Sequence, residues 1–589
     1  MSGEAPAGIV QLLAARAAAR PNDVAMRFKA RGLWRDVTWR ALEREMAEIA
    51  LGLESRALAA GEPVVVVSDL TPTWVASLLA VHAAGALPVS LYQALGTREV
   101  ADVFDALDAR LLLVDGLDWV GVMAERGAAI PSEIVVMDSD IRGARGQWRV
   151  VPLAEVRAGG RAILDGGESR WLELVKSTEA SRPCLLLATA GTSGTPKLVA
   201  HSARSLLASA SAVVAGEGRR PLDRSDSLVV ELPTGHLGAV VAGILVPLLS
   251  GAVAHLPEQV VSDAIAEVRP TVSLSSGHYW EREAALVAVT ARTTRGLRGR
   301  VFSLAERTMR RRAPSTRRFR FGGSVWFGVV LLPLLRKLGL DRLRSAYVLG
   351  PVALETLQAW RTWRVELTEL YWSTEAGVDV ARRRGGILEP APGVDLAVDE
   401  RSRLLVRSNA CAVGTWVGST VDAIADADGW LATDDLARTK DGGIALVGRQ
   451  GDIVLDGEAP VSLADIESAL RGSPYFRSAI VTADRGGELV ALVDLDIESV
   501  ARWASAEKVS YRSPSALRDS DEVRELIRAE VAATNEKLAE RGLPPVTQAV
   551  PSSDRFAIGR EVGPTWSPRR RPSLARSLGD AEEDLTRAS

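Results

Sequence analysis

The sequence predicts an α/β fold with a large N-terminal domain, whose β-sheets are covered by helices on both faces, and a smaller, mobile α+β domain at the C-terminus. Three observations predict it. Short apolar runs recur along the 589-residue chain, helical stretches separate them, and the pattern changes after Leu446 to two short apolar runs among helical segments. Strands that alternate with helices form largely parallel sheets that are buried on both faces.

Five apolar runs are the predicted strands of the large domain. They lie at residues 63–68, 109–116, 134–138, 184–192 and 227–233. In sheets of this kind, ligands bind beyond the carboxyl ends of the strands, where a strand runs into a loop. The run at 184–192 continues into a loop of small residues, so we expect a ligand there.

The stretch from Leu232 to Pro257 carries no formal charge and is long enough to span a bilayer. However, it contains several glycines, Pro247 and Ser250, and it is interrupted at Gly251. These residues favour a buried helix followed by a strand over a membrane span.

The C-terminal part contains two predicted strands, at 477–484 and 488–496, and a helical segment at 521–545 that is stopped by Gly542 and Pro544. We therefore expect one domain over residues 1–447 and a second, α+β domain over residues 448–589. The hinge between them is predicted near Gly448.

The composition is that of a globular chain, with 47% hydrophobic residues, 25% charged residues and a formal net charge of -3. These values exclude wholesale disorder and a protein with many membrane spans. Cys184 and Cys411 are the only cysteines, and the five histidines have no spacing typical of a zinc site. This cysteine usage favours a reducing, cytoplasmic setting. We expect no secretory signal, because the first thirty residues carry charges and lack a long apolar core.

One segment is unusually basic. Residues 291–320 contain eleven arginines, and the apolar stretch 325–335 follows them. One interpretation is a solvated helical face, and another is peripheral contact of residues 291–335 with an anionic membrane surface, such as the inner membrane. We expect no nucleic acid partner, because aromatic residues are few in the segment and no known binding module is visible.

The most informative stretch is the loop from Thr189 to Lys197. Its first seven residues are all glycine, alanine, serine or threonine. Their backbone amides can approach a polyanion closely and their hydroxyls can donate to it. Lys197 adds a positive charge, in a chain that has only seven lysines. The spacing is not that of a Walker loop.

This loop resembles the phosphate loop of the adenylate-forming superfamily, which contains acyl-CoA synthetases, amino-acid adenylation domains and luciferases. Other motifs of the superfamily are matched in the same order along the chain. They lie at residues 37–46, 82–93, 232–236, 347–355, 371–375, 430–436 and 447–467. Within the superfamily, the segments 90–116 and 135–148 and the basic insert are most similar to long-chain and very-long-chain fatty acyl-CoA synthetases.

The resemblance implies the adenylate-forming enzyme fold and an AMP-forming acid–thiol ligase that uses ATP, Mg²⁺ and coenzyme A. The substrates would be a carboxylic acid, of the fatty-acid type, and the thiol of CoA or of a carrier protein. Lys197, Thr374 and Glu375 would be catalytic, and Glu375 would also hold Mg²⁺. The nucleotide-binding residues would be Thr189, Gly191, Thr192, Ser193, Gly194, Thr195, Lys197, His236, Gly350, Tyr371, Thr374, Asp435 and Arg449.

The sequence departs from the superfamily pattern at the position of the catalytic lysine near the C-terminus, which Ser567 occupies. Trp372 and Asp434 stand where relatives have glycine. An arginine nearby would be no equivalent of the missing lysine, because its planar fork differs from a compact ammonium. An alternative function is therefore a relative that binds nucleotide or acyl-adenylate, or that performs only the thioester half-reaction.

Overall fold

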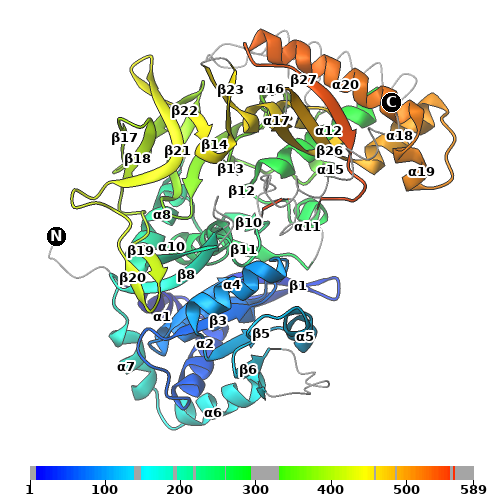
Figure 1. Ribbon diagram of the computed structural model, residues 1–589. Coiled ribbons are helices and arrows are strands. Elements are labelled where there is room, and N and C mark those ends of the chain that lie inside the picture. The colour runs from blue at the N-terminus through cyan, green and yellow to red at the C-terminus, as the bar shows by residue number, and fades with distance from the viewer. Residues whose placement is uncertain are drawn as a thin grey trace. The chain divides into compact units, whose positions relative to one another are not determined.

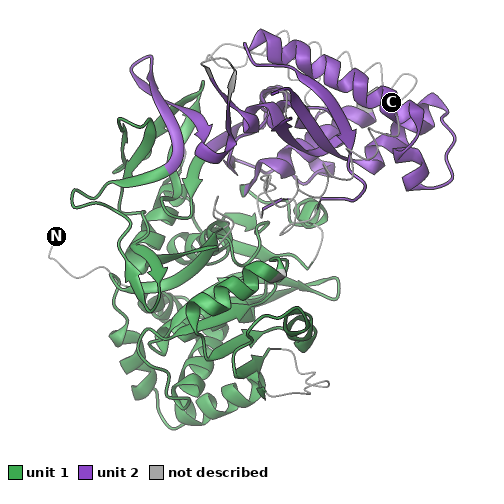
Figure 2. Cartoon of the chain, in the orientation of Figure 1, with its two compact units in different colours: residues 1–274, 370–433 green, residues 275–369, 434–589 purple. Residues whose placement is uncertain are grey.

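A computed structural model describes residues 8–137, 148–189, 196–216, 220–258, 261–293, 331–456, 459–484, 487–556 and 562–563. The order of the elements along the chain can be followed in Figure 1. The chain forms two compact units, shown in Figure 2. Unit 1 contains residues 1–274 and 370–433, and unit 2 contains residues 275–369 and 434–589.

The centre of unit 1 is a nine-stranded sheet. Its strands, in spatial order, are β20 (Thr420–Asp422), β19 (Gly414–Val417), β9 (Lys197–Ser202), β8 (Pro183–Thr189), β4 (Leu87–Leu91), β3 (Pro63–Val67), β5 (Leu111–Val114), β6 (Glu133–Val136) and β7 (Arg149–Pro152). The strands from β8 to β7 are parallel, and β9, β19 and β20 are antiparallel to their neighbours. Every residue of β3, β4, β5 and β6 is buried, which is typical of a sheet covered on both faces.

Helices connect the parallel strands, as predicted. The described helices of unit 1 with eight or more residues are α1 (Ile9–Ala19), α2 (Trp39–Glu54), α3 (Pro72–Ala83), α4 (Thr97–Leu107), α5 (Leu117–Glu125), α6 (Leu153–Asp165), α7 (Ser169–Ser177), α8 (Ala203–Ala215) and α11 (Val261–Val268). Helix α3 joins β3 to β4, α4 joins β4 to β5, and α5 joins β5 to β6. The predicted α/β fold is confirmed, and four of the five predicted runs are strands of this sheet.

Helices α2 and α6 pack at very short range. A Cβ atom added to Gly160 would clash with the carbonyl of Glu48, so the two backbones touch. Beside this contact the buried carboxylate of Glu48 accepts hydrogen bonds from Arg44, Arg157 and Arg161 at 2.8–3.2 Å. A buried carboxylate is stable only with such partners.

A second sheet of unit 1 has the order β10 (Ser227–Val229), β11 (Val253–Leu256), β1 (Val24–Ala30) and β2 (Leu33–Thr38). The fifth predicted run therefore belongs to this smaller sheet. The charge-free stretch forms α9 (Leu237–Val240), the π-helix η1 (Val241–Leu245) and α10 (Val246–Ser250), and then β11. Gly251, with a φ of 81°, ends the helix, so the predicted helix and strand are confirmed. Within the described ranges, every helix is too short or too polar to cross a membrane.

The rest of unit 1 is formed by antiparallel strands. Strand β15 (Gly377–Arg384) pairs with β16 (Ile387–Pro390), and β17 (Asp395–Val398) pairs with β18 (Arg403–Arg407). They follow β14 (Leu367–Ser373), which ends immediately before the turn that carries Thr374 and Glu375.

Unit 2 combines two distant segments of the chain. The first contains the end of β12 (Val272–Ser276), α12 (Gly277–Thr293), α15 (Leu332–Lys337), β13 (Ser345–Leu349) and α16 (Leu354–Thr362). The second begins within β21 (Leu431–Lys440), which forms a hairpin with β22 (Gly443–Arg449). The turn η3 (Gln450–Asp452) and the pair β23 (Ile453–Asp456) and β24 (Ala459–Ser462) follow. The rest consists of the helices α17 (Leu463–Arg471), α18 (Ile497–Glu507), α19 (Pro514–Arg518) and α20 (Asp521–Glu540), and the sheet of β25 (Phe476–Ala483), β26 (Leu489–Leu495) and β27 (Val546–Pro551). The strands and the long helix predicted for the C-terminal part are confirmed. Gly542, with a φ of 68°, follows α20.

The two segments of unit 2 share one core. Val289 of α12 belongs to the same apolar cluster as residues of α17, α18, α20, β25 and β26. Arg471 of α17 forms a buried ion pair of 2.8 Å with Glu281 of α12. The domain boundary near Gly448 stays a prediction, because a hinge is defined by movement and the two units are defined by contacts.

Candidate active site

The predicted phosphate loop connects two neighbouring strands of the central sheet of unit 1. Thr189 is the last residue of β8 and Lys197 the first of β9, and the two residues are paired. The Thr189 hydroxyl lies 3.4 Å from the Lys197 carbonyl, and Lys197 is exposed. The predictions for Gly191, Thr192, Ser193, Gly194 and Thr195 lie outside the described residues. Because β8 is parallel to β4, the loop begins at the carboxyl end of the sheet, where ligands bind.

The turn after β14 carries Thr374 and Glu375, and it is fixed to β9. The carbonyl of Thr374 accepts a hydrogen bond from Nε2 of His201, and the carbonyl of Glu375 accepts one from the amide of Ala412. Gly377, with a φ of 99°, closes the turn. A Cβ atom at that position would lie 2.6 Å from Oγ of Ser209. The structure therefore joins the strand of Lys197 and the turn of Thr374 and Glu375.

The side chain of Glu375 is only partly buried. Among the residues that the structure describes, its carboxylate has no hydrogen-bond or ion-pair partner, and no group of three or more acidic, histidine or cysteine side chains could hold a metal alone. A single carboxylate suits Mg²⁺ that is bound mainly through the phosphates of a substrate.

His236 is buried beside the turn and is 6% exposed. Its Nδ1 accepts the amide hydrogen of Gly238 at 2.9 Å, so Nε2 carries the proton. Burial lowers the pKa of His236 to about 3, and the ring is neutral near pH 7. In the described part of the chain Nε2 has no hydrogen-bond partner. The ring lies 4.6 Å from the ring of Trp372.

A network of hydrogen bonds holds the loop that precedes His236. The Thr234 hydroxyl donates to the carbonyl of Ser68 at 2.7 Å, and the Thr234 carbonyl accepts from Ser90. The Ser68 hydroxyl in turn donates to Asp115, and burial raises the pKa of that carboxyl. Sequence reasoning missed these residues, although Ser68 and Asp115 directly follow buried strands and so stand at the carboxyl end of the sheet.

Tyr371, in unit 1, is buried near the end of β14. Three further predicted nucleotide-binding residues, Gly350, Asp435 and Arg449, belong to unit 2. Asp435 and Arg449 stand opposite each other in the hairpin of β21 and β22. Gly350 follows β13 with a φ of 97°, a conformation that favours glycine.

Two further predictions concern residues outside the described part of the chain. Ser567 lies outside it, as do residues 294–330 of the predicted membrane-contact segment.

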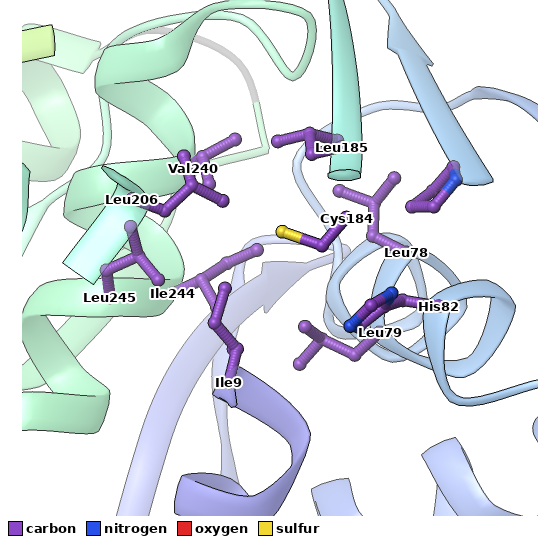
Figure 3. Close-up of a pocket in the computed structure, with 11 residues that line it drawn as sticks. Ile9, Leu78, Leu79, His82, Cys184, Leu185, Leu206, Val240, Ile244 and Leu245 are labelled. Carbon is purple, nitrogen blue, oxygen red and sulfur yellow. The ribbon is translucent and has the colours of Figure 1, made fainter. Parts of the chain in front are cut away.

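An apolar cavity of about 20 Å³ lies inside unit 1. Figure 3 shows the sulfur of Cys184 among the apolar side chains, with the ring of His82 beside Leu79. Burial lowers the pKa of His82 to about 4 and raises the pKa of the Cys184 thiol. A cavity of this volume holds about one water molecule, so in this conformation it is no acyl-chain site.

Comparison with known proteins agrees with this geometry. The chain is 26% identical over 498 residues to the long-chain-fatty-acid–CoA ligase FadD15 of Mycobacterium bovis, which covers 80% of this chain and 79% of that protein. Its fold is similar to the adenylation domain of a carboxylate reductase from Mycobacterium chelonae, with a TM-score of 0.73 and 16% identity over 99% of this chain and 92% of that one. It is also similar to the anthranilate CoA ligase AuaEII in complex with anthranoyl-AMP, with a TM-score of 0.68 and 17% identity over 98% of each chain.

The family model of AMP-binding enzymes matches residues 13–405. This range contains the strands β3 to β9 of the central sheet, the phosphate loop, and the turn of Thr374 and Glu375. The chain therefore belongs to the AMP-binding enzyme family.

Proposed function

We propose that this protein activates a carboxylic acid of the fatty-acid class and transfers the acyl group to the thiol of coenzyme A. In the first step a carboxylate oxygen attacks the α-phosphorus of ATP, the bond between the α- and β-phosphates breaks, and pyrophosphate leaves. In the second step the thiol sulfur attacks the acyl carbon of the acyl-adenylate. AMP leaves and the thiol proton passes to solvent.

The observation that carries the proposal is the connection between β9 and the turn after β14. It holds a cation, Lys197, and the carboxylate of Glu375, which has no partner among the described residues, on one connected part of unit 1. A carboxylate that attacks a polyphosphate needs positive charge and amide donors where negative charge develops. Lys197 and the loop that begins at Thr189 would supply them.

Each remaining residue would have a role in holding the nucleotide. Tyr371 would lie against the adenine, Thr374 would contact a phosphate and Asp435 would bind the ribose hydroxyls. Glu375 would hold Mg²⁺, which neutralises phosphate charge when it is bound. His236, through the protonated Nε2, would donate a hydrogen bond to an acceptor on a substrate.

The fatty-acid class is supported by the similarity to a long-chain-fatty-acid–CoA ligase. The thiol of a carrier protein is the other acceptor in this proposal. A cytoplasmic location, and contact of residues 291–335 with an anionic membrane, also belong to it. Binding to anionic vesicles that weakens with salt would support the membrane contact.

The test is an ATP–pyrophosphate exchange assay with carboxylic acids from short to very long chains, on the native chain and on Ser567→Lys in parallel. We expect exchange that depends on the acid and on Mg²⁺. If Ser567 limits the first step, Ser567→Lys raises the exchange rate. An absence of exchange with every acid, in both chains, contradicts the proposal.

A second function is favoured by one observation, the serine at the position of the catalytic lysine. A chain without that lysine would still carry out the thioester step, because the lysine serves the formation of the adenylate. Supplying a synthetic acyl-adenylate and CoA tests this function. Thioester formation without exchange supports it, and brisk exchange by the native chain excludes it.

A further inference from the structure

His201 is a buried histidine that connects two parts of the candidate site. It lies in β9, four residues after Lys197, and it is fully buried. Its Nε2 lies 2.8 Å from the carbonyl oxygen of Thr374, and its Nδ1 lies 3.2 Å from the hydroxyl of Ser205. One side chain thus links the strand that begins at Lys197 to the turn that contains Thr374 and Glu375.

The partners of the ring fix its protonation. A carbonyl oxygen can only accept, so Nε2 carries the proton and Nδ1 is the unprotonated nitrogen that faces the Ser205 hydroxyl. Burial lowers the pKa of His201 to about 4, although the hydrogen bond to the Thr374 carbonyl opposes this shift. Near pH 7 the ring is neutral and donates a single hydrogen bond, from Nε2 to the carbonyl of Thr374.

A separate link of main-chain atoms joins the same two parts. The amide of Val413 donates to the carbonyl of Ala200 at 2.9 Å, and the amide of Ala412 donates to the carbonyl of Glu375 at 2.7 Å. A substitution at His201 leaves these main-chain bonds in place. It would therefore loosen the turn without removing it from the sheet.

We propose that His201 is a positioning residue, which holds the Thr374–Glu375 turn in a fixed place relative to β9 and thereby sets the affinity for the magnesium complex of ATP. This inference rests on the proposed function in one respect, namely that Lys197 and Glu375 act on the same nucleotide. If the turn moves relative to β9, Lys197 and Glu375 cannot both act on the phosphates of the same nucleotide. Residues that orient a ligating carboxylate typically change metal affinity or activity by 10–100-fold when they are replaced.

Three substitutions separate positioning from structural support. The amide nitrogen of glutamine reaches the position of Nε2, so His201→Gln keeps the donor to Thr374. His201→Asn reaches only the position of Nδ1, and His201→Leu keeps neither. His82→Gln is the matched control, because it replaces another buried histidine, one that lines the apolar cavity of unit 1.

The measurement is equilibrium binding of ATP to the full chain by calorimetry, once with Mg²⁺ and once with EDTA. We expect Mg²⁺ to strengthen binding to the native chain, to His201→Gln and to His82→Gln by the same factor. In His201→Leu and His201→Asn we expect this factor to fall about tenfold or more, with binding in EDTA unchanged. Thermal unfolding of every variant shows whether lost stability alone explains the result.

The inference is overturned if His201→Leu keeps the Mg²⁺-dependent gain, or if His201→Gln loses it as fully as His201→Leu does. Because binding needs no turnover, these outcomes are independent of the exchange assay. MgATP binding without pyrophosphate exchange, in the native chain and in Ser567→Lys alike, would contradict the proposed function and leave the positioning role of His201 intact.

Discussion

The carboxylate of Glu375 has no partner among the described residues, whereas the carboxylate of Asp379, on the following strand, is buried and paired with Arg382 at 2.8 Å. An unpaired carboxylate beside a phosphate loop is suited to a cation. We expect Glu375→Gln, which keeps the shape and removes the charge, to lower the rate of pyrophosphate exchange about 100-fold and to raise the Mg²⁺ concentration needed for half the maximal rate.

Titration of the exchange rate with Mg²⁺ measures both effects. Glu179→Gln is the control, because Glu179 is exposed and, among the residues that the structure describes, pairs with the exposed Arg182 alone. An unchanged Mg²⁺ requirement in Glu375→Gln would show that another residue holds the metal.

At the scale of single residues, the sequence motifs located the candidate site residues along the chain, but they did not indicate which other side chains contact them. Lys197, Thr374 and Glu375 stand at the ends of strands, and their motifs place them there. The contacts of His201 with Thr374 and of Thr234 with Ser68 join residues more than 160 positions apart. No local pattern encodes such a pair, so only the folded chain shows it.

Among the elements, the packing of helix α2 against helix α6 depends on the buried carboxylate of Glu48. Burial alone would raise the pKa of Glu48, but hydrogen bonds from Arg161, Arg157 and Arg44 outweigh this effect and lower the pKa to about 2. A carboxyl whose pKa is lower in the folded state stabilises the fold above its unfolded pKa of about 4.5. That stability is lost as the pH falls from about 4.5 towards 2.

We therefore expect Glu48→Gln to destabilise the native chain by about 1–3 kcal/mol near pH 7, and the difference from the native chain to shrink as the pH falls below about 4.5. Urea unfolding at several pH values between about 7 and 3.5 measures it. Glu54→Gln, at the end of the same helix, is the control, because that carboxylate pairs with the half-exposed Arg170. A difference that stays constant with pH would contradict the role assigned to the charge of Glu48.

The positions of strands and helices were predicted from the sequence more completely than any other feature of the structure. Valine and leucine runs became strands because a sheet buried on both faces needs apolar residues at every position. The charge-free stretch became a helix and a strand because Gly251 adopts a positive φ and ends the helix. The π-helix η1 within it was not predicted, since its five residues are as apolar as their α-helical neighbours and periodicity cannot separate the two.

In the whole molecule, the grouping of residues 275–369 with the C-terminal segment was not predictable from patterns, because it depends on contacts between residues nearly 200 positions apart. The ion pair of Glu281 and Arg471 is the clearest of them. Glu281 is 5% exposed, and it also accepts a hydrogen bond from the amide of Ala353. Arg541 adds a second ion pair of 3.0 Å, with Glu355 of α16.

The ion pair of Glu281 and Arg471 offers a test of the predicted hinge near Gly448. Arg471→Met removes the cation and leaves the carboxylate of Glu281 buried, which is strongly unfavourable. If residues 448–589 separate from α12 as a body, we expect hydrogen exchange at the amides of α12 and α17 to rise about tenfold or more, while β25, β26 and β27 stay protected. Arg528→Met is the control, because Arg528 is exposed and pairs within α20. If the rise instead spreads through that sheet and α20, unit 2 opens as one cooperative body and the boundary near Gly448 is wrong.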